Sequence, residues 1–170
     1  DREMRDAFIP DDGCIILEAD LSQAEDRVVK AYSAAVTRDP TRRENLLARA
    51  RANPWENDEH TRRASLIYYN NPRAITDLLF ATDARVTKPQ RYLAKRAGHA
   101  GNYDMHGNRL SEEILKEGIV ISPEEGDQMI GTILDRDVPE VRLWQASIRQ
   151  EILRNRCLAN SWGLVVDYAY

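Results

Sequence analysis

The sequence is poor in cysteine and contains no long apolar run. Its 170 residues include two cysteines, Cys14 and Cys157, which form no Cys-x-x-Cys pair and have no histidine at metal-ligand spacing. These absences argue against a disulfide scaffold or a zinc ribbon and favour a reducing compartment. No apolar stretch approaches the about 20 residues that a membrane-spanning helix needs, and the first residues lack the layout of a signal peptide. We therefore expect a cytoplasmic protein without a membrane partner.

An overall excess of basic charge is also missing. The chain has 24 basic and 28 acidic side chains, a net charge of −4, which argues against a protein that simply coats nucleic acid. The charges are segregated, however: residues 1–26 and 111–140 each hold nine acidic and two basic side chains, whereas residues 85–96 hold five basic and no acidic ones. A second, looser basic stretch covers residues 38–51. Such blocks suggest a phosphate site beside a carboxylate site, although ordinary solvated helix faces would give the same pattern.

Apolar periodicity and helix-start signals predict a mainly α fold with a small β part (α+β). Residues 14–19 are typical of a short buried strand, which ends at Asp20. Ser22 as N-cap, with Glu25 three residues later, predicts a capping box at the start of the next helix. The tail, residues 162–170, is strand-like.

Five more helices are expected along the chain, after a stretch punctuated by Pro40 and Asn53-Pro54. One of them begins at Thr87 with a second capping box, closed by Gln90, and has Pro89 in its first turn. Another begins at Ser122, with Pro123 at the first helical position. Of the remaining three helices, one begins near Asp58 and one carries Ile75, Leu78 and Leu79. The last one runs from about Pro139 to Asn155.

Two groups of residues are candidates for chemistry. Asp20 stands at the end of a strand, where a rigid backbone suits a ligand of Mg²⁺. Taken alone, Asp20 can also be explained as a turn or cap residue, and Glu25 can be explained as the glutamate of the capping box. Arg91, Lys95, His99 and Tyr103 are spaced by four and form one helical stripe that suits a polyphosphate and a flat base. A solvated basic face with Tyr103 anchored in the core would explain the same spacing.

Three segments together resemble the polymerase domain of the DNA polymerase I family (family A, bacterial and phage). Residues 20–27, DLSQAEDR, are similar to motif A, DYSQIELR. Residues 91–105, RYLAKRAGHAGNYDM, are similar to motif B on the O helix of the fingers, R-x-x-x-K-x-x-x-F/Y-G-x-x-Y-G. Residues 58–60 resemble the family's D-x-H element. The order and spacing of the three agree, which makes the resemblance more specific than any single motif.

The resemblance implies roles for individual residues. Asp20 and the Leu21 carbonyl would bind Mg²⁺ (two ions in the complete enzyme), Glu25 would exclude a ribose 2′-hydroxyl, and Lys95 would also protonate the departing pyrophosphate. Arg27 and Tyr103 would lie near the primer and template DNA. The positions implied to bind the incoming dNTP are Gln23, Glu25, His60, Arg91, Lys95 and His99.

The same resemblance implies a division into a palm fragment (residues 1–36), helical fingers (37–155) and a return toward the palm (156–170). The parent protein would be a DNA-directed DNA polymerase of a bacterium or phage-infected cell, with primer–template DNA and dNTPs as partners. The 170 residues contain no His-Asp-Glu like motif C. We therefore expect a fragment that needs the rest of the polymerase, with its thumb and motif C, and is inactive alone.

The sequence departs from motif B at three positions, where His99 replaces an aromatic residue and Ala100 and Asp104 replace glycines. In motif A, Leu21, Ala24 and Asp26 replace Tyr, Ile and Leu. Two alternatives therefore stay open. One is a non-catalytic nucleotide- or DNA-binding helical module derived from the polymerase fold, and the other is a structural helical domain in which the matches arise by chance.

Overall fold

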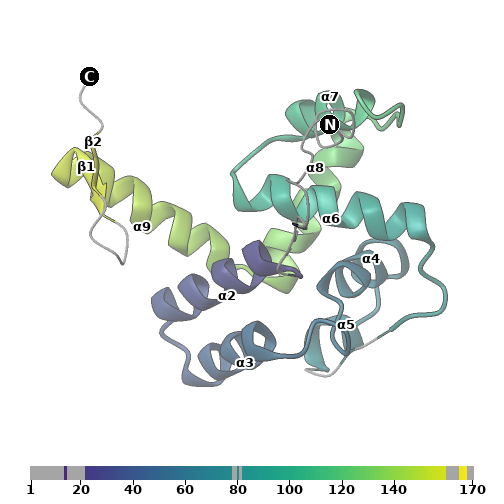
Figure 1. The fold of residues 1–170 in the computed structure, drawn as a ribbon, viewed down its shortest axis with the longest axis horizontal. Helices are drawn as coiled ribbons and strands as arrows, with labels where there is room; N and C mark the ends of the chain where they lie inside the picture. The colour runs from purple at the N-terminus through teal and green to yellow at the C-terminus, as the bar shows by residue number, and fades with distance from the viewer. Residues whose placement is uncertain (1–13, 15–21, 78–79, 81, 160–164, 168–170) are drawn as a thin grey trace.

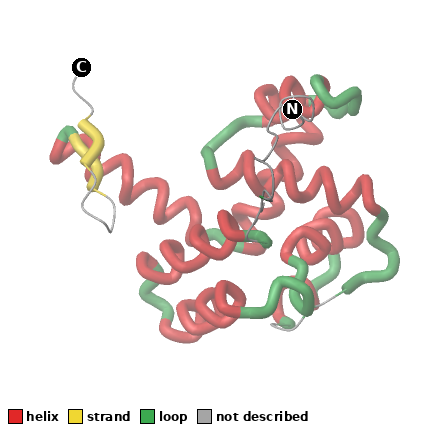
Figure 2. Tube along the Cα trace, in the orientation of Figure 1, coloured by secondary structure: helices red, strands yellow, loops and turns green. Residues whose placement is uncertain are grey.

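The computed structural model describes residues 14, 22–77, 80, 82–159 and 165–167. Over these residues the chain is mainly helical with one small two-stranded antiparallel sheet, as expected from the sequence (Figures 1 and 2). In chain order the elements are α2 (Ala24–Val36), α3 (Pro40–Arg51), α4 (Glu59–Tyr69), α5 (Arg73–Thr76), α6 (Lys88–Asn102), α7 (Gly107–Leu115), α8 (Pro123–Thr132), the π-helix η1 (Ile133–Asp137), α9 (Glu140–Asn155), β1 (Cys157–Ala159) and β2 (Val165–Asp167).

The predicted capping box at Thr87 and the predicted helix start at Ser122 are both confirmed. Thr87 and Gln90 cap α6, and Ser122 and Glu125 cap α8, each by reciprocal hydrogen bonds between side chain and backbone. These bonds satisfy amide groups that the first helical turn leaves without an intrahelical partner. The start of α6 fixes the positions of the motif B side chains.

The other predicted capping box, Ser22 with Glu25, is wrong. Helix α2 begins at Ala24, and its N-cap is Gln23, whose backbone has a φ of 56° and whose side chain makes no cap hydrogen bond. The carboxylate of Glu25 instead contacts α6. The Glu25 side chain, which the local pattern assigned to capping α2, therefore makes a tertiary contact with another helix instead.

The stretch punctuated by proline contains a helix that was not expected. Asp39 accepts hydrogen bonds from the amides of Thr41 and Arg42, and Pro40 occupies the first turn of α3. This N-cap and proline pair is a helix-start signal of the same kind as those recognised elsewhere. Helix α5 is shorter than the segment predicted around Ile75, and Leu78, Leu79 and the predicted strand after Cys14 lie outside the described residues.

The apolar core lies where α6 packs against α8 and η1, with contributions from α2, α3, α7 and α9. Ala97 and Ala100 on α6 are buried in this core together with Ile130 of α8 and Ile133 of η1. Each large aliphatic side chain buried in this way contributes about 1.5–3 kcal/mol. The core therefore holds α6 firmly, while the opposite side of that helix stays available for a site.

A second interior region is ionic. Seven side chains from α2, α3, α4 and η1 are almost completely buried and form what we call the buried ionic cluster: Asp26, Lys30, Arg49, Glu59, Arg62, Arg63 and Asp137. Arg49 bridges Glu59 at 2.6 Å and Asp137 at 2.8 Å. Arg63 pairs with Asp26 at 2.7 Å, and Lys30 pairs with Glu59 at 3.3 Å.

The oppositely charged groups of the buried ionic cluster keep one another ionised. Burial alone would raise the pKa values of Asp26 and Glu59, but the neighbouring cations lower both pKa values below their usual range, chiefly Arg63 for Asp26 and Arg49 for Glu59. Both carboxylates are therefore ionised at neutral pH. The cluster ties the start of α2 to the start of α4, which fixes two walls of the site described below.

The cluster also explains part of the looser basic stretch noted in the sequence. Arg49 is buried among acidic partners, Arg42 pairs with Glu140 at 2.7 Å, and Arg43 donates to the carbonyls of Ala34 and Thr37. These three arginines are therefore all held by partners within the protein, and Arg49 is buried as well.

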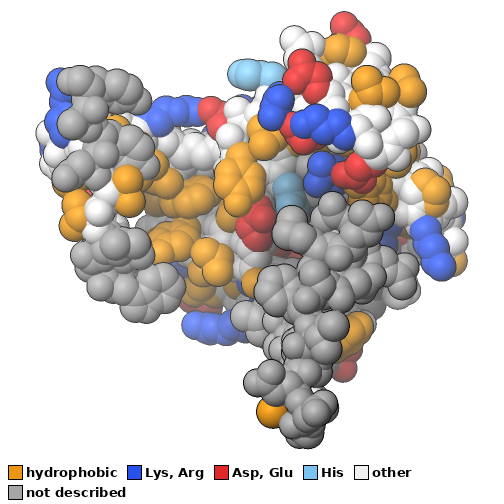
Figure 3. Space-filling view, turned by 45° about the horizontal axis from the view of Figure 1, so that its top comes forward, with side chains coloured by type: hydrophobic (Ala, Val, Ile, Leu, Met, Phe, Trp, Pro, Cys, Tyr) orange, Lys and Arg blue, Asp and Glu red, His pale blue; other side chains and the backbone are white. Residues whose placement is uncertain are grey.

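At the far end of α9 the chain forms the β1–β2 hairpin, in which Leu158 faces Val166 (Figure 1). The strand at Val165–Asp167 confirms part of the predicted strand-like tail. Near this end, hydrophobic side chains gather on the face shown in Figure 3, where a groove of about 460 Å³ lies between α2, α9 and the hairpin. No helix in the described part of the chain has the length and apolar character needed to cross a membrane.

Candidate functional site

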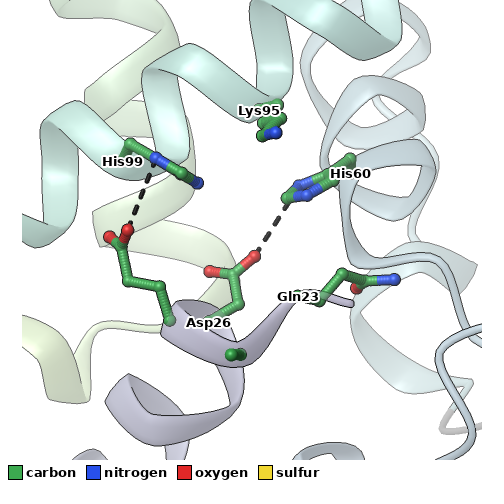
Figure 4. Close-up of a pocket in the computed structure, with 7 residues that line it drawn as sticks. Gln23, Asp26, His60, Lys95 and His99 are labelled. Carbon is green, nitrogen blue, oxygen red and sulfur yellow. Dashed lines mark ion pairs between the residues drawn. The ribbon is translucent and has the colours of Figure 1, made fainter. Parts of the chain in front are cut away.

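A pocket of about 300 Å³ brings together residues from all three sequence segments (Figure 4). The N-terminal end of α2, the first turn of α4 and the exposed side of α6 form its walls. Its lining side chains are Gln23, Ala24, Glu25, Asp26, His60, Lys95 and His99. We call this cavity the motif pocket.

Helix α6 contributes Lys95 and His99, which stand one turn apart and both line the pocket (Figure 4). Lys95 is exposed and has no hydrogen-bond or ion-pair partner among the described residues. An ammonium group without a protein partner, at the edge of a polar cavity, is available to an anionic ligand.

His60 reaches the motif pocket from the first turn of α4 (Figure 4). Its ring is only 5% exposed, and its Nδ1 lies 3.6 Å from Oδ2 of Asp26. Burial lowers the pKa of His60 to about 4 despite the opposing charge of Asp26. The imidazole is therefore neutral at pH 7 and offers a hydrogen bond rather than a positive charge.

Glu25 is held from the side of α6. Its Oε1 accepts a hydrogen bond from Nδ2 of Asn102 at 3.1 Å, and its Oε2 lies 3.4 Å from Nδ1 of His99. The Glu25 and His99 side chains are each about one third exposed, so the carboxylate remains accessible from the pocket. Asn102 was not among the candidates, because it occupies an unspecified position of motif B.

Gln23 and Arg27 serve mainly to join elements. The amide of Gln23 donates to the Pro54 carbonyl at 3.2 Å and accepts from the Glu59 backbone at 3.1 Å, which ties the start of α2 to the segment before α4. Arg27 donates to the Ala50 carbonyl at 2.7 Å. Gln23 still lines the motif pocket, whereas Arg27 does not.

Arg91 and Tyr103 do not line the motif pocket. Arg91 pairs with Asp58 through two contacts of 2.5 and 3.1 Å, and Asp58 also caps α4. Tyr103 follows the last residue of α6 and is 65% exposed, so the alternative that it anchors the core is wrong. Of the four-residue stripe, the fold therefore brings Lys95 and His99 into the pocket.

The metal ligands suggested by the sequence, Asp20 and the Leu21 carbonyl, lie outside the described residues. Within the described part of the chain, no group of three or more His, Cys, Asp or Glu side chains is arranged to hold a metal ion. Asp26 faces the pocket, but Arg63 already occupies its carboxylate. The two Mg²⁺ ions therefore stay a prediction that depends on Asp20.

Comparison with known proteins adds no family assignment, because no protein-family model and no curated protein matches this chain.

Proposed function

We propose that the chain is the segment of a family A DNA polymerase that binds the incoming dNTP. The observation that carries this proposal is the motif pocket. Residues 23–26, His60 and the Lys95–His99 pair come from three separated segments, each of which resembles a family motif, and they line one cavity. A chance match of short patterns would not require the three segments to meet.

The pocket chemistry suits a nucleoside triphosphate. Lys95 would meet the triphosphate as a compact point charge, and neutral His60 would contribute a hydrogen bond. Arg91 stands one helical turn before Lys95 and is paired with Asp58. It would also bind the triphosphate if phosphate oxygens replaced Asp58 as the partner of its guanidinium group. Glu25 would face the sugar.

The backbone at the end of α6 also supports the resemblance. Asp104 has a φ of 57°, in the left-handed region that favours glycine, and motif B has glycine at this position. The Met105 amide then bonds the Ala100 carbonyl at 2.9 Å, which closes the helix end. A chain related to the family would keep this backbone conformation at residue 104 even after the glycine itself had been replaced by aspartate.

The reaction of the complete polymerase would be nucleotidyl transfer. Two Mg²⁺ ions, when bound, stabilise the attacking and the leaving oxygens in such reactions. In this chain Lys95 would neutralise charge on the triphosphate and give a proton to the departing pyrophosphate. Primer–template DNA would approach Arg27 and Tyr103.

Calorimetric titration of the whole chain with dGTP and Mg²⁺ tests the proposal. We expect saturable binding, and a loss of about tenfold or more in Lys95→Ala, because a charge-assisted contact contributes about 1.5–3 kcal/mol. Lys116→Ala, at an exposed lysine of the segment after α7, is the matched control. Absence of binding, or equal affinities of the two variants, would overturn the proposal.

A non-catalytic nucleotide-binding module is the second candidate. The departures from motif B at His99, Ala100 and Asp104 favour it, because they alter positions that the family pattern specifies. Both candidates predict dGTP binding and no primer extension by this chain alone. They differ when the remainder of a polymerase is supplied, since magnesium-dependent extension is expected only of the polymerase segment.

A further inference from the structure

Two side chains of α6 hold both carboxylate oxygens of Glu25. Asn102 donates to Oε1 at 3.1 Å, and the Nδ1 of His99 lies 3.4 Å from Oε2. Residues three apart on a helix lie on the same face, so the two groups reach Glu25 from one surface. We call this arrangement the Glu25 clamp.

The clamp is built from residues that the family pattern does not supply. Asn102 occupies an unspecified position of motif B, and His99 stands where the pattern has Phe or Tyr. An aromatic ring in place of His99 would have no nitrogen to offer the carboxylate. The arrangement is therefore a property of this chain rather than of the motif.

We propose that His99 and Asn102 are positioning residues that fix Glu25 and thereby set the preference of the motif pocket for deoxyribose over ribose. The inference rests on the proposed function and concerns the same pocket. A glutamate side chain has several rotatable bonds, so it excludes a hydroxyl group sterically only when its carboxylate is held in place. The clamp supplies two contacts that hold it.

The surrounding charges leave the clamp as the main restraint on Glu25. Asp26, the neighbouring carboxylate, is taken up by Arg63 at 2.7 Å, and His60 is neutral. Lys95 lines the same pocket from α6 but makes no ion pair with Glu25. Releasing the clamp should therefore free Glu25 without disturbing the groups proposed to bind phosphate.

The experiment compares the affinities of the whole chain for dGTP and GTP. We expect the unmodified chain to prefer dGTP. In Asn102→Ala we expect this preference to fall by about tenfold, through tighter GTP binding, because a pocket that no longer excludes one small group loses discrimination of that order. Asn108→Ala, at an exposed asparagine of α7, is the matched control.

A second variant keeps the test valid if Asn102→Ala does not fold. Asn102→Asp preserves the shape of the side chain but sets a carboxylate against Glu25, so we expect the same loss of preference. His99→Ala, which removes the ring nitrogen that faces Glu25, should act in the same direction.

Each outcome decides between the two proposals. An unchanged dGTP-to-GTP ratio in the folded variants, or a parallel loss of both affinities, would overturn the clamp while leaving dNTP binding intact. Absence of binding of either nucleotide to the unmodified chain would overturn the proposed function and the clamp with it.

Discussion

Arg63 of α4 extends across Gly98 of α6, in the space that a side chain at residue 98 would fill. A Cβ atom added to Gly98 would lie only 3.0 Å from Cζ of Arg63 and closer still to one of its terminal nitrogens. The absence of a side chain lets Arg63 reach Asp26 at 2.7 Å. The Arg63 side chain thus passes between α4 and α6 and binds Asp26, which lines the motif pocket.

Gly98→Ala is therefore expected to destabilise the chain by about 1–3 kcal/mol, because overpacking must displace a buried guanidinium. Urea denaturation measures the effect. Gly131→Ala is the matched control, since an added Cβ there meets only Asp135 at an ordinary 3.6 Å. Gly131 stands just before α8 continues into η1, so its backbone is helical on both sides, and alanine there should be neutral or stabilising by up to about 1 kcal/mol. Equal effects of the two substitutions would contradict this packing account.

Glu59→Gln is expected to destabilise the chain by about 3–5 kcal/mol, because it leaves the buried charges of Lys30 and Arg49 without their shared partner. The comparison variant is Glu113→Gln, which removes a carboxylate from exposed pairs with Arg109 and Lys116. We expect no measurable change there, since solvent screens such pairs. Denaturation midpoints that shift equally would contradict the assignment of the cluster as structural.

The stability of the chain should fall as the pH is lowered from about 6.5 to 4. The pKa of His60 is about 4 in the fold and 6.5 when unfolded, so the unfolded chain binds more protons in this window. The loss attributable to His60 is roughly 3 kcal/mol. His60→Asn should flatten the stability curve between these pH values but not below them, where Asp26 and Glu59 protonate. Parallel curves for the two proteins would contradict the buried, neutral state of His60.

Asp58→Asn is expected to strengthen triphosphate binding severalfold. The substitution keeps a side-chain oxygen to cap α4 but removes the charge that pairs with Arg91 at 2.5 Å. Arg91 is then free to contact phosphate. Titration with inorganic tripolyphosphate measures the gain, and adding Arg91→Met should abolish it. Weaker binding by Asp58→Asn would show that the Asp58–Arg91 pair itself holds the site together.

Local signals in the sequence predicted the helix starts whose side chains satisfy their own backbone. Thr87 and Ser122 follow this rule, and the general α+β class follows from the same patterns. Asp39 with Pro40 carried an equally local signal for α3, which the neighbouring prolines and asparagines masked. Such information lies within four or five residues and needs no knowledge of the tertiary fold.

The parts that sequence reasoning missed depend on partners distant in the chain. Glu25 has a local capping role available but bonds Asn102 instead, 77 residues away. Arg49 was assigned to a basic stretch, although it is neutralised by Asp137, 88 residues away. Four-residue spacing placed Lys95 correctly beside His99 but could not show that Arg91 is held by Asp58. Pairing of charges across helices is visible only once the helices are packed.

The most direct test of the central claim is amide NMR of the isotope-labelled chain during titration with dGTP and Mg²⁺. The account predicts that the largest chemical-shift changes occur at Glu25, His60, Lys95 and His99, which line one pocket from three helices. Deoxyguanosine without phosphates should leave Lys95 nearly unaffected. Changes confined to α7 and α8, or no changes at saturating dGTP, would contradict the assignment of the motif pocket as a dNTP site.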